Sequence, residues 1–81
     1  MRRINIAQME QGQEGRIVEI QGGIGLLNRL DSMGLRIGKR VVKVSHSFWR
    51  GPVTLNVGTT QLSLGFGMAS KVIIEMEEPE K

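Results

Sequence analysis

The sequence contains no cysteine and no tyrosine, and only three of its 81 residues are phenylalanine or tryptophan. The absence of cysteine excludes disulfide bonds, thiolate metal sites and thiol nucleophiles, and it fits a reducing compartment. No apolar run approaches the roughly 20 residues that cross a bilayer, and the first residues lack the continuous apolar stretch of a secretory signal. We therefore expect a single cytoplasmic domain that is not embedded in a membrane.

Acidic residues are scarce in the middle of the chain. Between residues 29 and 50 only Asp31 is acidic, whereas six residues there are basic and the segment EMEEPEK at the end is acidic. This asymmetry predicts a basic face, although a solvated surface is the commoner explanation for such a charge pattern.

Residues that carry out catalysis or bind metals are also few. The chain has one histidine, His46, and no HxH, HxxxH or cysteine pair. Ser45 and Ser47 flank it too closely to define a base and a nucleophile, and no carboxylates stand in a recognisable pair. The GGIG at 22–25 resembles a phosphate cradle, but Asn28 occupies the third glycine position and no P-loop lysine follows, so a tight turn is the better account. We expect no catalytic residues, no metal site and no cofactor.

The hydrophobic pattern predicts five short strands and one helix. Alternating or β-branched runs bounded by glycine indicate strands at 15–20, 39–45, 52–57, 60–64 and 71–76. Leu26, Leu30 and Met33 form an apolar helical stripe that ends at Gly34, where a left-handed residue would place Leu35 against Leu30. The GFGMAS before the last strand is expected to be a turn or one helical turn. So many strands in so short a chain predict an all-β, strongly bent sheet or partly closed small barrel with one packed helix.

One loop holds the scarcest side chains. The segment HSFWRGP, residues 46–52, contains the single histidine, the single tryptophan and one of two phenylalanines. Trp49 could fold back as a lid over one end of the barrel. Alternatively, Phe48 and Trp49 stay exposed beside Arg50, a combination typical of protein interfaces and of base stacking.

The order of these motifs resembles that of a known family. EGRIVEIQGG, then GLLNRLDSMGLRIGKRV, then GPVTLNVGTTQLSLGFGMASKVIIE is similar to the ferrous iron transport protein A family (FeoA). The resemblance runs from about residue 4 to residue 76. It implies an SH3-like, five-stranded small barrel with one packed α-helix, as a single domain at 4–76, followed by an acidic tail at 77–81 that we expect to be flexible.

The resemblance also implies a function. It implies a non-enzymatic accessory protein of ferrous iron transport, expected to bind and modulate the cytoplasmic, GTPase-containing part of the transporter at the inner face of the cell membrane; stabilising the transporter, gating it and changing its GTP hydrolysis all stay open. We expect the partner-binding residues to be an aromatic loop and a charged rim: Phe48, Trp49 and Arg50, with Arg36, Lys39 and Lys43.

Two alternatives remain open. A strand-rich basic domain with loop aromatics could bind single-stranded nucleic acid, although the acidic tail and the lack of aromatics on the predicted strands disfavour this. The SH3-like unit also resembles the C-terminal domain of iron- and manganese-dependent repressors, which reach DNA through a separate helix-turn-helix domain. Weak self-association through a strand edge stays open as well.

Overall fold

The computed structural model describes residues 1–46 and 51–76, with only the backbone of His46. In chain order, the elements are β1 (Arg2–Asn5), η1 (Ile6–Gln8), β2 (Glu14–Ile20), α1 (Gly23–Ser32), β3 (Arg40–His46), β4 (Val53–Val57), β5 (Thr60–Leu64), α2 (Phe66–Ala69) and β6 (Val72–Met76). The five predicted strands, the main helix and the predicted helical turn are all present. A sixth strand, β1, was not predicted.

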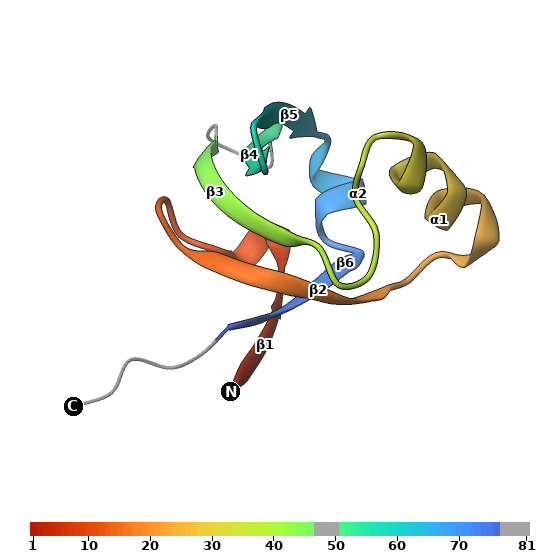
Figure 1. Ribbon diagram of the computed structural model, residues 1–81, viewed down its shortest axis with the longest axis horizontal. Coiled ribbons are helices and arrows are strands. Elements are labelled where there is room, and N and C mark those ends of the chain that lie inside the picture. Colours follow the sequence, from red (N-terminus) through yellow and green to blue (C-terminus); the bar gives the residue numbers. More distant parts are fainter. Residues whose placement is uncertain (47–50, 77–81) are drawn as a thin grey trace.

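All strand pairs are antiparallel and form one sheet in the order β1-β6-β2-β3-β4-β5 (Figure 1). The sheet therefore ends at β1 and β5, and β1 pairs with the last strand of the chain rather than with its neighbour in sequence. Register shifts at Ile17/Glu19 and at Lys43/Ser45 bend the sheet into a barrel-like shape without closing it.

The core lies on the concave side of this sheet. In β4, Val53, Leu55 and Val57 are buried and the alternate residues are not, as the period of two requires. β6 shows the same alternation, with Ile74 fully buried at its centre. β6 lies between β1 and β2 in the sheet, and β4 lies on the other side of β3. The buried side chains of β4 and β6 nevertheless belong to one hydrophobic cluster.

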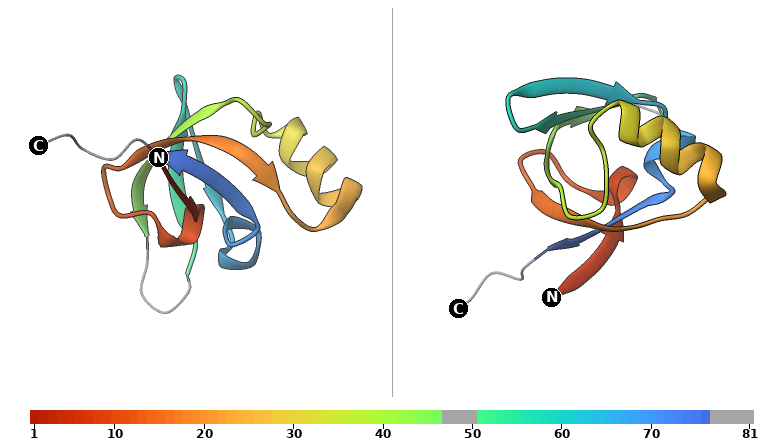
Figure 2. Two further views of the ribbon diagram at one scale, coloured as in Figure 1. Left: turned by 90° about the horizontal axis from the view of Figure 1, so that it is seen from below. Right: turned by 45° about the vertical axis from the view of Figure 1, so that its right-hand side comes forward.

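The helix α1 lies beyond the end of β2, to one side of the sheet (Figures 1 and 2). Its expected exit is confirmed: Gly34 has φ +90°, and its N–H donates to the Asp31 carbonyl at 2.9 Å. The Leu35 N–H donates to the Leu30 carbonyl, also at 2.9 Å, which completes a Schellman motif. Leu30 and Leu35 are both fully buried, so the helix exit is anchored in the core.

The glycines of the GGIG segment support the turn interpretation. Gly22, at the N-cap of α1, and Gly23, its first residue, have φ values of +105° and +87°, a left-handed backbone that glycine adopts without strain.

Candidate partner-binding surface

The segment after α1 forms a rigid turn at the surface. The Lys39 N–H donates to the Arg36 carbonyl at 3.0 Å, and Gly38 has φ +96°, the conformation that the third residue of a type II turn requires. We call residues 36–39 the cationic turn. It is joined to β2 by two further bonds, from the Gly38 N–H to the Ile17 carbonyl at 2.8 Å and from the Ile17 N–H to the Lys39 carbonyl at 2.9 Å. Because Ile17 is fully buried, the turn is attached directly to the core.

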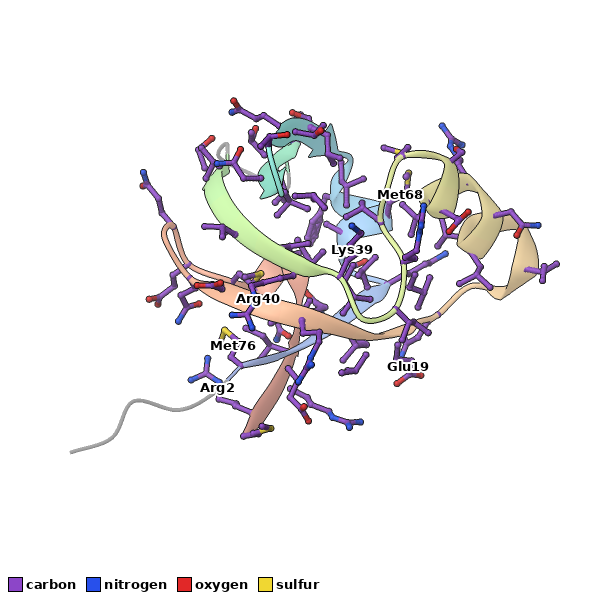
Figure 3. The ribbon with its side chains drawn as sticks, in the orientation of Figure 1. Arg2, Glu19, Lys39, Arg40, Met68 and Met76 are labelled. Carbon is purple, nitrogen blue, oxygen red and sulfur yellow. The ribbon has the colours of Figure 1, made fainter. Side chains whose placement is uncertain are left out.

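Ile37 occupies the second position of the cationic turn, and 59% of its surface is exposed. The cations on either side of it, Arg36 and Lys39, are also exposed (Figure 3 labels Lys39). Arg36 Nε lies 2.9 Å from Asp31 Oδ1, but both side chains are more than half exposed, so this ion pair adds little stability. Lys39 makes no ion pair with the described residues. The turn therefore presents an apolar side chain with positive charge around it, on a backbone that is already fixed.

Sequence reasoning selected Arg36 and Lys39 but missed Ile37. The available signal was an isoleucine between two cations and directly before Gly38. This isoleucine belongs neither to the helical stripe that ends at Gly34 nor to the strand that follows Gly38, so neither pattern predicts that it is buried. Ile24, on the first turn of α1, is also exposed.

The prediction that Lys43 lies on a charged rim is wrong. Its relative exposure is 1%, because Lys43 shares the inward face of β3 with Val41. Its ammonium donates to three backbone carbonyls at the end of η1: Nζ lies 3.2 Å from Ile6 O, 3.4 Å from Ala7 O and 2.7 Å from Met9 O. Burial lowers the pKa of Lys43 below its usual 10.5.

Carbonyls at a helix end carry partial negative charge and need donors, which explains why a cation is tolerated in the interior. Lys43 also binds this segment through its backbone, since its carbonyl accepts from Gly12 N and its N–H donates to Gln13 O. Lys43 is therefore a structural residue that holds the connection between β1 and β2.

The remaining predicted contact residues, Phe48, Trp49 and Arg50, lie outside the described residues. Both interpretations of Trp49, as a core lid and as an exposed anchor, stay predictions.

In the described part of the chain, no three histidine, cysteine, aspartate or glutamate side chains gather as metal ligands would. No described helix is long and apolar enough to cross a bilayer.

The fold and surface define a class: a small SH3-like β domain with one main helix, on which the described residues form an exposed turn with basic side chains. Among solved structures, it is similar to the crystal structure of an iron uptake regulatory protein (FeoA), with a TM-score of 0.84 and 28% identity over 93% of this chain and 97% of that one. The NMR structure of a FeoA-like protein from Clostridium acetobutylicum also has a TM-score of 0.84, at 16% identity, covering 100% of this chain and 94% of that one.

The family model described as the FeoA domain matches residues 4–76. A Methanocaldococcus jannaschii protein named "Putative Fe(2+) transport protein A" is 30% identical over 73 residues, which cover 90% of this chain and 87% of that protein. The chain therefore belongs to the FeoA family, which is associated with ferrous iron transport, and the resemblance seen in the sequence is confirmed.

The repressor resemblance is one of fold. A manganese-dependent transcriptional repressor superposes with a TM-score of 0.84 at 14% identity, and the match covers 93% of this chain but 42% of the repressor.

Proposed function

We propose that this protein is a non-enzymatic accessory of ferrous iron transport that binds and modulates the cytoplasmic, GTPase-containing part of the transporter, at the inner face of the cell membrane. The observation that carries the proposal is the FeoA family match over residues 4–76.

The cationic turn supports a binding role on physical grounds. Protein interfaces gain most of their affinity from a few well-placed side chains, and a rigid anchor loses little conformational entropy on binding. Ile37 meets both conditions, since it is exposed and the two residues that follow it, Gly38 and Lys39, are hydrogen-bonded to buried Ile17. We therefore assign Ile37, Arg36 and Lys39 to the proposed contact, in addition to the loop residues Phe48, Trp49 and Arg50 that the sequence predicted.

The direct test is titration of the full chain with the soluble cytoplasmic domain of a ferrous iron transporter, followed by the fluorescence of Trp49, the sole tryptophan. Single-stranded RNA is titrated separately. Saturable binding to the transporter domain supports the proposal, whereas a response to RNA alone would replace it with the nucleic-acid alternative. The GTP hydrolysis rate of the transporter domain, with and without this protein, then tests modulation.

The surface is tested with a matched pair of substitutions. Ile37→Ser should weaken binding to the transporter domain about tenfold, as expected for loss of an interface anchor. Ile24→Ser, which makes the same change at another exposed isoleucine, should leave the affinity unchanged. Equal effects of the two substitutions would remove the cationic turn from the contact while leaving the accessory function intact.

A further inference from the structure

Two arginines face one another across the β2–β3 ladder. The register pairs Arg16 directly with Arg40, and both side chains are exposed. Like charges directly opposite each other disfavour strand pairing, so the Arg16–Arg40 pair does not stabilise the β2–β3 ladder. On the other side of β2, Arg16 lies opposite Glu75 of β6.

The neighbouring carboxylates are already engaged by other arginines. Arg40 Nη1 lies 3.0 Å from Glu14 Oε2, and Arg3 Nε lies 3.2 Å from Glu75 Oε2. Arg16 makes no ion pair or side-chain hydrogen bond with any residue in the described part of the chain. Its guanidinium thus keeps a full set of donors, beside a second guanidinium that is 70% exposed.

These arginines line a cavity of about 260 Å³, together with Glu14, Gly15, Glu75 and Met1. A Cβ on Gly15 would point into the core, 2.6 Å from Ile74 Cδ1, so Gly15 presents only backbone to the cavity. The labelled Arg40 and Met76 lie on the side of the molecule away from α1 (Figure 3). The cavity is therefore separate from the helix.

The charges indicate what the cavity accepts. Guanidinium groups recognise carboxylate and phosphate oxygens through paired hydrogen bonds. The lining side chains Arg16 and Arg40 balance Glu14 and Glu75, and Arg3, which is paired with Glu75, makes the neighbourhood of the cavity positive. A carboxylate carries a single negative charge, so it meets less repulsion from Glu14 and Glu75 than a phosphate dianion would.

We propose that the Arg16–Arg40 cavity binds a carboxylate, with Arg16 as its principal donor. The carboxylate can come from an acidic side chain of a protein or from a small organic acid. Acidic residues of this chain beyond β6 are a further source, since Glu77, Glu78 and Glu80 follow Met76 in the sequence.

The experiment is an NMR titration of the 15N-labelled full chain with sodium acetate, at an ionic strength held constant with chloride. We expect saturable shifts of the amide signals of Gly15, Arg16 and Val41, which chloride alone does not produce. Arg16→Gln should weaken acetate binding about fivefold, because it removes one charge-assisted contact at an exposed site. Arg29→Gln, the same charge change on exposed α1, should leave the binding unchanged.

Two further titrations separate the sources of the carboxylate. Tighter binding of the peptide acetyl-Gly-Glu-Gly-amide than of acetate supports a protein side chain, and the reverse order supports a small acid. If the combined variant Glu77→Gln, Glu78→Gln, Glu80→Gln shifts the Gly15 signal and binds acetate more tightly than the parent, the chain supplies its own carboxylate.

Several results would overturn the proposal. These are tighter binding of inorganic phosphate than of acetate, equal losses in the Arg16 and Arg29 variants, and acetate-induced shifts that map away from β2 and β3. Because these measurements use the protein alone, they do not depend on the accessory function.

Discussion

At the scale of single residues, Lys43 is the least expected feature of the molecule. It is a buried cation with no acidic partner among the described residues, and its donors are used by the carbonyls of Ile6, Ala7 and Met9. A buried carbonyl that loses its donor costs about 1–3 kcal/mol. The burial of Lys43 could be predicted in part, because strand alternation puts Val41 and Lys43 on the same face of β3. The sequence does not show which carbonyls accept from the ammonium.

Replacing Lys43 by methionine keeps most of the side-chain volume and removes the donor. Met9 O then loses its 2.7 Å contact, so we expect Lys43→Met to lower the free energy of unfolding by about 2 kcal/mol. Urea denaturation followed by circular dichroism measures this change. Lys39→Met, at an exposed lysine, should alter stability by less than about 0.5 kcal/mol. A Lys43→Met variant as stable as the parent would show that the carbonyls find water or other donors.

The lowered pKa of Lys43 determines the direction in which the stability of the protein changes with pH. Because burial lowers the folded-state pKa below 10.5, the unfolded chain binds more protons between the two pKa values. The stability of the parent relative to Lys43→Met should therefore rise as the pH increases through the window below 10.5. Paired urea denaturation of both proteins at about pH 7 and about pH 10 gives this difference. A relative stability that falls over this range would mean that the carbonyl contacts outweigh desolvation.

At the scale of elements, the cationic turn connects α1 to β3 through a segment that is hydrogen-bonded at both ends. The Schellman bonds fix its start, and the two hydrogen bonds to Ile17 fix its end. The sequence predicted the helix exit at Gly34, because its signal is local. It could not predict the attachment to β2, because those bonds join residues far apart in the chain.

The conformation of the turn predicts opposite effects for two glycine substitutions. An added Cβ has open space at both Gly38 and Gly25, but only Gly38 has a positive φ. Gly38→Ala should therefore destabilise the protein by about 1–2 kcal/mol. Gly25→Ala, inside α1, should be neutral or stabilise it by up to about 1 kcal/mol.

Thermal unfolding measures both variants, with about 4–8 °C expected for each kcal/mol in a domain of this size. If Gly38→Ala unfolded at the temperature of the parent, the left-handed turn would not be required.

At the scale of the whole molecule, stability should be highest where the sheet is paired on both sides. β6 lies between β1 and β2, and Ile74 at its centre is fully buried, whereas β5 pairs only with β4. We expect the paired amides of β6 to show the slowest hydrogen exchange and those of β5 to exchange faster. Exchange followed by NMR checks this order, and equal protection in the two strands would indicate that the β5 edge is covered in solution.

The sequence predicted most of the fold because the signals of β2, β3, β4, β5 and β6 are periodic and bounded by glycine. It missed β1, because RRIN begins with two charged residues and shows no alternation. That strand forms through its partner β6, from the opposite end of the chain, which local pattern cannot show. The candidate contact residues were predicted less completely for the same reason. Arg36 and Lys39 were visible as charges, but the exposure of Ile37 depends on how its turn is attached to β2, and the meeting of Arg16 with Arg40 depends on strand register.

The pairing of β1 with β6 has a consequence for gene architecture. Arg2 lies opposite Met76, so the described fold starts and stops at neighbouring points on one edge of the molecule. A unit with adjacent entry and exit points can be inserted into a loop of a longer protein, or reopened elsewhere as a circular permutant, with little disturbance to its interior. This geometry makes the domain a self-contained unit that a longer chain could carry at an internal position.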